Sequence, residues 1–232
     1  MAFLVASLLN GMSLDFDEEL YKEGYELIVG CDEAGRGCLL GPVFAAAVIL
    51  PKGFRSPLIN DSKKLTAKKR EEAFKVITEN ALAYAISSVD PETIDEVNIL
   101  NASRMAMQQA ISKLNHQFDI IVTDCMKMKG YEVPVIDLVH GDALSQTIAA
   151  ASILAKVSRD NLCIELDKKY PEYNIKKNKG YGTKDHLEAL KKYGPVKGLH
   201  RFSYAPVRNC KIEKFHFFKN FLDDFAKTSL LL

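Results

Sequence analysis

The strongest constraint on the fold of this chain is a series of apolar segments of strand length. The first two, at 26–31 and 42–50, enclose the glycine-rich segment AGRGCLLG, which predicts two strands joined by a loop. Three more such runs follow at 82–89, 119–124 and 133–140, each bounded by charged residues, glycine or proline. These five runs are the candidate strands of one sheet.

Helical patterns lie between and after the later strands. A helix is predicted over 66–80, with Thr66 as its N-cap. Apolar residues at helical spacing predict a second helix over 98–114 and a long core helix over 143–170. Two strands first and alternating elements later are typical of an α/β fold in which helices flank a mixed sheet.

The length and composition fit one main domain. The chain has 232 residues, of which 47% are apolar and 26% charged, so it can bury one sizeable core. We expect an N-terminal arm at 1–22, a main domain at 23–210 and a helical tail at 211–232, in which 215–222 would form an amphipathic helix. Because 31 basic residues balance 30 acidic ones, a nucleic-acid partner would have to be bound by local basic clusters.

The five cysteines form no CxxC pair and have no zinc-ligand spacing with histidine, which favours a reduced, cytoplasmic protein. The apolar N-terminal run lacks the basic residues of a signal peptide. No run approaches the length of a membrane span, so no membrane partner is expected.

Acidic side chains follow three of the predicted strands. Asp32 and Glu33 come directly after an apolar run, Asp124 ends another, and Asp142 follows Gly141 just beyond a third. Strand ends open onto the crevice where ligands bind in sheets of this kind, so the four acids are candidates for one catalytic site. Hard carboxylate oxygens favour two Mg²⁺ or Mn²⁺ ions, which can stabilise a phosphodiester displacement. The alternative is that each acid is a solvated strand terminus.

Neighbours in a regular strand point to opposite faces. Asp32 and Glu33 can therefore share a site only if the strand ends or bulges there, and the AGRG segment that follows favours this expectation. The other acidic clusters, at 15–19 and at 223–224, have no strand-end setting and are predicted to face solvent.

Five motifs together resemble the ribonuclease HII family, in the family's order and over residues 26–207. They are GCDEAGRGCLLGPVFAAAV at Gly30–Val48, DSKKL at Asp61–Leu65, the strand end at Asp124, GDALSQTIAAASILAKVSRD at Gly141–Asp160 and NKGYGTKDH at Asn178–His186. The resemblance implies a ribonuclease H-like mixed five-stranded sheet flanked by helices, with a small helical C-terminal extension. It also implies that Asp32, Glu33, Asp124 and Asp142 are the catalytic residues and the ligands of two divalent ions, with Asp142 adjusting or releasing the second.

The activity implied by the resemblance is endonucleolytic. Its substrates would be the RNA strand of RNA–DNA hybrids and single ribonucleotides embedded in duplex DNA, cut 5′ to the ribonucleotide to leave a 3′-hydroxyl and a 5′-phosphate. Such an enzyme removes ribonucleotides in DNA replication and repair. The rival functions are another ribonuclease H-like nuclease, of the HIII type or a resolvase, and a hybrid-binding protein without catalysis.

The resemblance also assigns substrate contacts. Gly35, Arg36 and Gly37 would recognise the ribose beside the scissile phosphate, which suits glycines because they allow close backbone approach to a 2′-hydroxyl. Tyr181 would stack on the sugar next to the junction. The structural alternatives are a hairpin loop that needs glycine and an ordinary loop tyrosine; a nucleotide loop is disfavoured because the spacing misses GxGxxG.

Two basic clusters are candidates for gripping phosphates on both sides of the cut. The first consists of Lys63, Lys64, Lys68, Lys69 and Arg70, and the second of Lys176, Lys177, Lys179 and Lys184. From them we select Lys63, Lys64 and Lys179, together with the adjacent Ser62, as substrate-binding. A solvated helix face and loop is the alternative. His200 and Arg201 are further candidates for phosphate contacts, without a catalytic role.

Two departures from the family pattern stand near the acids. Cys38 replaces a usual proline, and Cys125-Met126 replaces a common Gly-Asn; both changes put the local loops in doubt and place thiols near the predicted metals. We expect a monomer. A sliding-clamp contact through 215–222 is conceivable, but the glutamine that it requires is missing.

Overall fold

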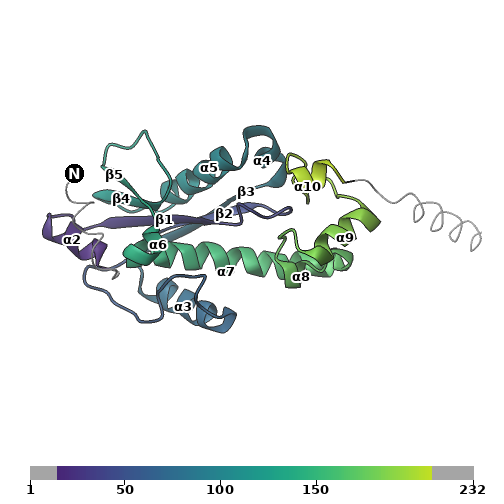
Figure 1. Cartoon of the computed structure of the whole chain (residues 1–232). Coiled ribbons are helices and arrows are strands. Elements are labelled where there is room, and N and C mark those ends of the chain that lie inside the picture. The colour runs from purple at the N-terminus through teal and green to yellow at the C-terminus, as the bar shows by residue number, and fades with distance from the viewer. Residues whose placement is uncertain (1–14, 211–232) are drawn as a thin grey trace, which may run out of the picture. The chain divides into compact units, whose positions relative to one another are not determined.

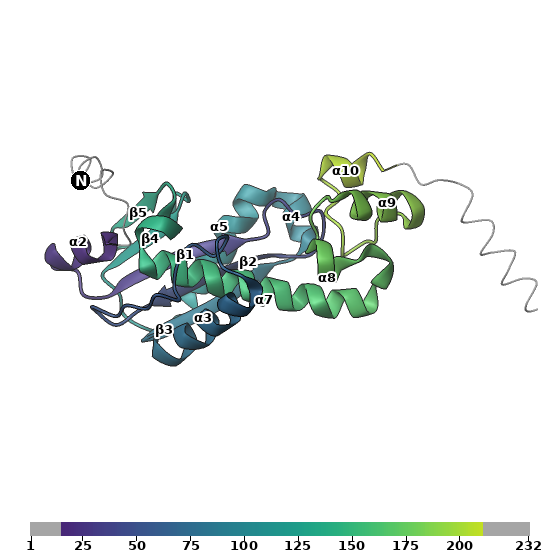
Figure 2. The ribbon, with the colours of Figure 1, turned by 60° about the horizontal axis from the view of Figure 1, so that its bottom comes forward.

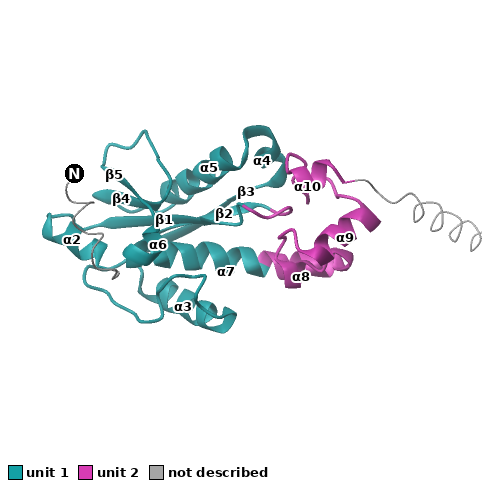
Figure 3. Ribbon diagram, in the orientation of Figure 1, with its two compact units in different colours: residues 1–36, 42–161 teal, residues 37–41, 162–232 magenta. Residues whose placement is uncertain are grey.

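The computed structural model describes residues 15–210, which divide into two compact units. Within the described residues, unit 1 comprises 15–36 and 42–161, and unit 2 comprises 37–41 and 162–210 (Figure 3). The predicted helical tail at 211–232 and most of the predicted N-terminal arm lie outside the described residues. The domain boundaries given above therefore remain predictions.

Unit 1 is built on a five-stranded sheet in the order β3-β2-β1-β4-β5 (Figure 1). The strands are β1 (Ile28–Ala34), β2 (Val43–Ile49), β3 (Ala83–Val89), β4 (Ile120–Asp124) and β5 (Val135–Leu138). β1 pairs with β2, and β2 with β3, in antiparallel register, whereas β4 runs parallel to both β1 and β5. The sheet is thus mixed, and each strand coincides with a predicted apolar run to within a few residues.

The expectation that β1 ends or bulges at the first two acids is wrong. β1 continues to Ala34 in regular register, with Asp32 opposite Ala46 and Glu33 opposite Ala45. The reason is that β2 supplies antiparallel partners up to Phe44, so the connecting loop begins only after Ala34. Asp32 and Glu33 therefore leave opposite faces of the strand.

The described part of unit 1 contains six helices or parts of helices. They are α2 (Phe16–Lys22), α3 (Ala67–Asn80), α4 (Pro91–Val97), α5 (Ile99–Ser112), α6 (Gly141–Leu144) and the larger part of α7 (Gln146–Lys169). Three of them, α3, α4 and α5, begin at a side-chain cap. Thr66 caps α3 as predicted, through a hydrogen bond from the Lys69 amide. Asn98 caps α5 in the same way.

Helices cover both faces of the sheet (Figures 1 and 2). On one face, α3 and α7 pack on β2, where Ala46 and Val48 join Ala73, Ile77 and the apolar residues of α7 in one core cluster. α5 packs on the strands from the other side. This arrangement buries both faces of β1 and β2, which explains why these strands are apolar throughout.

Unit 2 has its own small core. It contains the 3₁₀ turn η1 (Pro171–Tyr173) and the helices α8 (Ile175–Asn178), α9 (Lys184–Tyr193) and α10 (Ala205–Arg208). The segment 37–41 joins it through backbone hydrogen bonds, from Leu39 to Gly180, from Gly41 to Leu199 and from Arg201 back to Leu39. Its core includes Leu39, Leu40, Tyr173, Leu190 and Leu199.

None of the helices in the described part of the chain combines the length and the apolar character that crossing a bilayer requires.

Candidate active site

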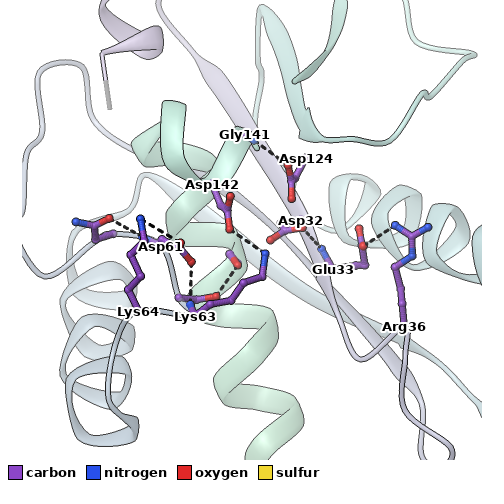
Figure 4. Close-up of polar contacts among 12 residues, drawn as sticks. Asp32, Glu33, Arg36, Asp61, Lys63, Lys64, Asp124, Gly141 and Asp142 are labelled. Carbon is purple, nitrogen blue, oxygen red and sulfur yellow. Dashed lines mark hydrogen bonds and ion pairs between the residues drawn. The ribbon is translucent and has the colours of Figure 1, made fainter. Parts of the chain in front are cut away.

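Three of the four predicted acids meet at one end of β1 (Figure 4). Asp32 lies on β1, and Asp124 ends the neighbouring parallel strand β4. Asp142 is the second residue of α6, and the amide of its neighbour Gly141 donates a 2.7 Å hydrogen bond to Asp124 Oδ1. Asp32 and Asp142 are buried, and Asp124 is partly so. The parallel pairing of β1 with β4 and the turn into α6 thus bring these acids together.

Asp32 is oriented by its own backbone and by α7. Its Oδ1 accepts a 2.7 Å hydrogen bond from the Glu33 amide. The Asp32 carboxylate also accepts a hydrogen bond from the Ser152 side chain. The Ser152 hydroxyl lies 2.9 Å from that of Ser62. Because a carboxylate only accepts, Ser152 donates to Asp32 and Ser62 donates to Ser152. Sequence reasoning missed Ser152, which stands in an alanine-rich stretch of the predicted core helix.

Glu33 extends from β1 toward Arg36 rather than toward the other acids (Figure 4). Its Oε1 accepts a 3.1 Å hydrogen bond from Arg36 Nη1, whereas its buried Oε2 has no hydrogen-bond partner. A buried carboxylate oxygen without a partner is costly. Glu33 can therefore offer one oxygen to a ligand.

Lys63 is a basic residue whose ammonium group lies beside the three converging acids (Figure 4). Its Nζ lies 3.3 Å from Asp142 Oδ2, although most of the Lys63 side chain is exposed. Burial alone would lower the pKa of Lys63. The carboxylates of Asp142, Asp32 and Asp124 raise it by more, so the pKa of Lys63 lies above its usual value. Of the two lysines of the DSKKL segment, Lys63 is the one whose side chain reaches the acids in Figure 4.

The carboxyl groups of Asp32, Glu33 and Asp124 have pKa values above those of ordinary acids. Burial, followed by repulsion from Glu33 and Asp124, raises the pKa of Asp32 well above its usual value. Burial also raises the pKa of Glu33, which Arg36 partly offsets, and that of Asp124, which the Gly141 amide partly offsets. Burial and mutual repulsion therefore disfavour the charged forms of these three carboxylates in the absence of a cation.

No group of three or more His, Cys, Asp or Glu side chains between residues 15 and 210 is already arranged as a complete metal site. The donor set nevertheless fits a hard divalent cation. It consists of carboxylates, one of them with an unpartnered oxygen, and their mutual repulsion is relieved when a cation binds. Asp32, Asp124 and Asp142 are the converging residues that would hold such ions. Glu33 leaves the opposite face of β1 and contacts Arg36, so its part in the metal site remains a prediction.

The two glycines of the Gly-Arg-Gly segment differ in their surroundings. Gly35 has a φ of +98°, and a Cβ built on it would lie 2.1 Å from Nε of the buried Arg159. The space left by the absent side chain therefore holds Arg159. Gly37 belongs to unit 2, is exposed, and a Cβ there would lie 3.8 Å from the ring of Tyr181.

Tyr181 stands in a tight turn of unit 2, with its side chain 44% exposed. Lys179 and Gly180 before it both have positive φ, and the Asn178 side chain accepts from the Gly180 amide. Within unit 2 the structure thus brings two predicted substrate contacts together, Gly37 and Tyr181, with the half-buried Lys179 two residues before the tyrosine.

Other predictions are altered by burial. His200 and Arg201 are 1% and 0% exposed, so the expectation that they contact phosphates is wrong; both are hydrogen-bonded inside unit 2. Ser62 is buried against Ser152, and Lys64 makes a 3.6 Å ion pair with Asp61, so their substrate contacts remain predictions.

The five cysteines are free, and only one of the two near the motifs is accessible. Cys38 is fully buried, contrary to the expectation of an exposed thiol, because its segment packs into the core of unit 2. Cys125 is exposed and has a φ of +52°, a backbone conformation that favours glycine.

The chain is similar to known proteins over most of its length. A family model described as ribonuclease HII matches residues 29–207. Ribonuclease HII of Acholeplasma laidlawii is 54% identical over 195 residues, which cover 84% of this chain and 95% of that protein. Ribonuclease HII of Desulfitobacterium hafniense is 51% identical over 192 residues, covering 83% and 74%.

Solved structures share the fold. Ribonuclease H2 from Pyrococcus horikoshii OT3 superposes with a TM-score of 0.69 at 26% identity, over 80% of this chain and 97% of that one. Bst-RNase HIII in complex with Mn²⁺ gives a TM-score of 0.63 at 16% identity, over 82% and 70%. The predicted ribonuclease H-like fold, a mixed five-stranded sheet flanked by helices, is confirmed.

Proposed function

This chain belongs to the ribonuclease HII family and is an endoribonuclease of RNA–DNA hybrids, and from that premise we propose that it also cuts duplex DNA at a single embedded ribonucleotide. The cut falls on the 5′ side of the ribonucleotide and leaves a 3′-hydroxyl and a 5′-phosphate. Its role is then the removal of ribonucleotides in DNA replication and repair.

The observation that carries the proposal is the convergence of Asp32, Asp124 and Asp142 at the end of β1, where burial and nearby carboxylates raise the pKa of Asp32 and Asp124. Carboxylates without a nucleophilic serine or cysteine are suited to hydrolysis by water. The Mn²⁺ named for Bst-RNase HIII supports the same metal chemistry by analogy of fold.

Hydrolysis here means that a water oxygen forms a bond to phosphorus while the bond from phosphorus to the 3′ oxygen breaks. Two Mg²⁺ or Mn²⁺ ions, when bound, supply the positive charge that activates water and stabilises the leaving oxygen. Asp32 and Asp124 hold their carboxylates in fixed orientation through the Glu33 and Gly141 amides. Lys63, beside Asp142, offers an exposed ammonium group to a neighbouring phosphate.

Sugar selection is assigned to Gly37 and Tyr181 of unit 2, together with Gly35 and Arg36. The exposed backbone at Gly37 beside a half-exposed ring offers a surface against which a ribose can pack. The ring stacks on the sugar next to the junction, so the enzyme prefers a ribonucleotide that is followed by DNA.

The test is cleavage of an end-labelled DNA duplex with one ribonucleotide, with Mg²⁺ and with a chelator. Wild-type enzyme is expected to give one cut, 5′ to the ribonucleotide, and only with metal. Asp32→Asn and Asp124→Asn should each lower kcat by at least about a hundredfold, because each removes negative charge from the metal site. Calorimetric Mn²⁺ titration should show the same two variants losing metal affinity.

A matched control is Asp137→Asn, which changes an exposed carboxylate on β5 and should leave both cleavage and Mn²⁺ affinity near wild type. Wild-type activity in the Asp32→Asn, Asp124→Asn double variant would remove these acids from the mechanism. Cleavage of long hybrids only would favour an HIII-type enzyme, cleavage of junction DNA a resolvase, and binding without cleavage a non-catalytic protein.

We also propose that the protein works as a monomer in a reducing cytoplasm. Its five free cysteines support the second part of this proposal.

A further inference from the structure

Two buried histidines of unit 2 form a continuous hydrogen-bonded chain that ends on the tyrosine turn. His200 Nδ1 lies 3.0 Å from the amide nitrogen of Val196, and His200 Nε2 lies 3.3 Å from His186 Nε2. His186 Nδ1 in turn lies 2.9 Å from the carbonyl oxygen of Tyr181. The chain thus connects the loop before His200 to the residue assigned above to sugar stacking.

The groups at the two ends fix where the protons lie. The Val196 amide can only donate, so His200 Nδ1 accepts and His200 carries its proton on Nε2. The Tyr181 carbonyl can only accept, so His186 Nδ1 donates and His186 Nε2 is unprotonated. The His200 Nε2–H therefore donates to His186 Nε2, and one arrangement of neutral rings satisfies all three contacts.

The surroundings keep both rings neutral. His186 and His200 are 0% and 1% exposed, and the Tyr173 ring packs at centroid distances of 6.3 Å and 4.9 Å from them. The Tyr173 hydroxyl is used in a 2.6 Å hydrogen bond to the Gly194 carbonyl. The charged neighbours on α9, Lys184 and Asp185, are exposed and pair with Glu188 and Lys177. Burial lowers the pKa of both histidines.

The tyrosine turn depends on this support. The Tyr181 carbonyl accepts from His186 and also from the Thr183 amide at 2.8 Å, and Thr183 caps α9. On the other side, the Gly180 carbonyl accepts from Leu39, which follows the Gly37 segment. The hydrogen bond from the His186 side chain thus fixes the Tyr181 carbonyl from within the core of unit 2.

We propose that His186 and His200 are positioning residues that hold the Tyr181 turn. With His200 protonated on Nε2 and His186 on Nδ1, their hydrogen bonds fix the Tyr181 carbonyl, and the position of the turn sets the affinity for a ribonucleotide flanked by DNA. The proposal rests on the function proposed above for Tyr181. Neither histidine touches substrate, so the effect of changing them passes through the position of the ring beside Gly37.

The proton order is tested directly by ¹⁵N NMR of the histidine rings in the full chain near neutral pH. The expected result is a neutral His186 with its proton on Nδ1 and a neutral His200 with its proton on Nε2. The opposite tautomer on either ring, or a positive charge on either ring, would overturn the proposal.

The link to substrate is tested with two variants of His186 that preserve different halves of the ring. His186→Asn retains a donor near the position of Nδ1, whereas His186→Gln retains an amide near Nε2 and loses the donation to Tyr181. On the single-ribonucleotide duplex, the glutamine variant should raise KM about three- to tenfold, as for one lost hydrogen bond, with kcat changed less than about twofold. The asparagine variant should have a KM close to that of the wild-type enzyme.

A double-mutant cycle with Tyr181→Ala separates positioning from general damage. In the Tyr181→Ala background, His186→Gln should have little further effect on KM, because the group that it positions is absent. Equal KM changes in both backgrounds, or equal KM for the asparagine and glutamine variants, would contradict the proposal. If the wild-type protein does not cut the substrate, the proposed function fails instead, and the NMR result still decides the proton order.

Discussion

At the scale of single residues, a close contact between the backbones of β1 and α7 decides which side chain can stand at position 30. Gly30 lies in the middle of β1, where a Cβ would come within 2.3 Å of the Thr147 carbonyl carbon at the start of α7. Because that neighbour is backbone, it cannot rotate away as a side chain can. This contact sets how closely α7, which carries Ser152, approaches the strand that carries Asp32.

We therefore expect Gly30→Ala to destabilise the protein by roughly 3 kcal/mol or more, because the helix and the strand must separate. Urea unfolding followed by circular dichroism measures the loss. Gly37→Ala is the matched control, since a Cβ there meets no atom closer than 3.8 Å. Similar stability of the two variants would contradict the proposed role of the close contact.

The cysteines give a second prediction at this scale. Cys125 is exposed, while Cys31, Cys38 and Cys163 are buried. Iodoacetamide applied to the native protein should therefore modify Cys125 well before these three thiols, as peptide mass spectrometry would show. Because Cys125 follows Asp124 directly, the modification should also lower activity, and Cys125→Ser should be protected from that loss. Early labelling of Cys38 would contradict its burial.

At the scale of elements, the long helix α7 is capped by a residue from another helix. Asp17 of α2 is 1% exposed, and its carboxylate accepts hydrogen bonds from the Thr147 amide at 3.0 Å and from the hydroxyls of Thr147 and Ser145 at 2.8 Å and 2.5 Å. The prediction that the acids at 15–19 face solvent is thus wrong for Asp17. The cap ties α2 to the start of α7.

Removing this cap should cost stability. Asp17→Ala leaves the Thr147 amide and two buried hydroxyls without their acceptor, with an expected loss of roughly 2 to 3 kcal/mol in the free energy of unfolding. Thermal or urea unfolding measures it. Glu19→Ala, which removes an exposed ion pair with Lys22, should change stability by less than about 1 kcal/mol. A loss at Glu19 as large as that at Asp17 would refute the capping argument.

Most elements could be predicted from the sequence because their signals are local. Apolar runs mark the strands, and Thr66 and Asn98 mark the starts of α3 and α5. The continuation of β1 to Ala34 could not be predicted in the same way, because it depends on pairing with β2. The burial of Asp17 depends on contacts with residues 128 and 130 positions away.

The site shows the same division. The sequence places Asp32, Asp124 and Asp142 at or just beyond apolar runs, and Figure 4 shows these acids together, although β1 continues past Asp32 and Asp142 lies on α6. The direction of Glu33 and the role of Ser152 depend on three-dimensional neighbours, Arg36 and α7. The histidine pair was missed because nothing local distinguishes a buried histidine from a surface one.

At the scale of the whole molecule, two sets of buried groups respond to acid in opposite directions. The pKa values of Asp32 and Glu33 are raised on folding, so these groups favour the native state as the pH falls. His200 does the reverse, because burial, followed by the charge of a protonated His186, lowers its pKa to about 4. As the pH falls, the carboxyl groups stabilise the native state and His200 destabilises it. The change in wild-type stability with pH is therefore the sum of these two opposing contributions.

A His200→Asn variant isolates the histidine contribution. The unfolded chain binds a proton to His200 near its ordinary pKa of 6.5 and the native state only near 4, so this stabilisation is complete above about pH 6.5 and is lost as the pH falls toward 4. The stability gap between wild type and variant should shrink by up to roughly 3 kcal/mol over that range. Urea unfolding at several pH values measures the gap, and a gap that stays constant would contradict the lowered pKa.

The division of unit 2 into two stretches of chain has a consequence for biosynthesis. Residues 37–41 are synthesised before their hydrogen-bond partners Gly180, Leu199 and Arg201, which follow more than a hundred residues later. The nascent chain must therefore carry the apolar Leu39 and Leu40 without their final neighbours until the segment that contains Leu199 has been synthesised.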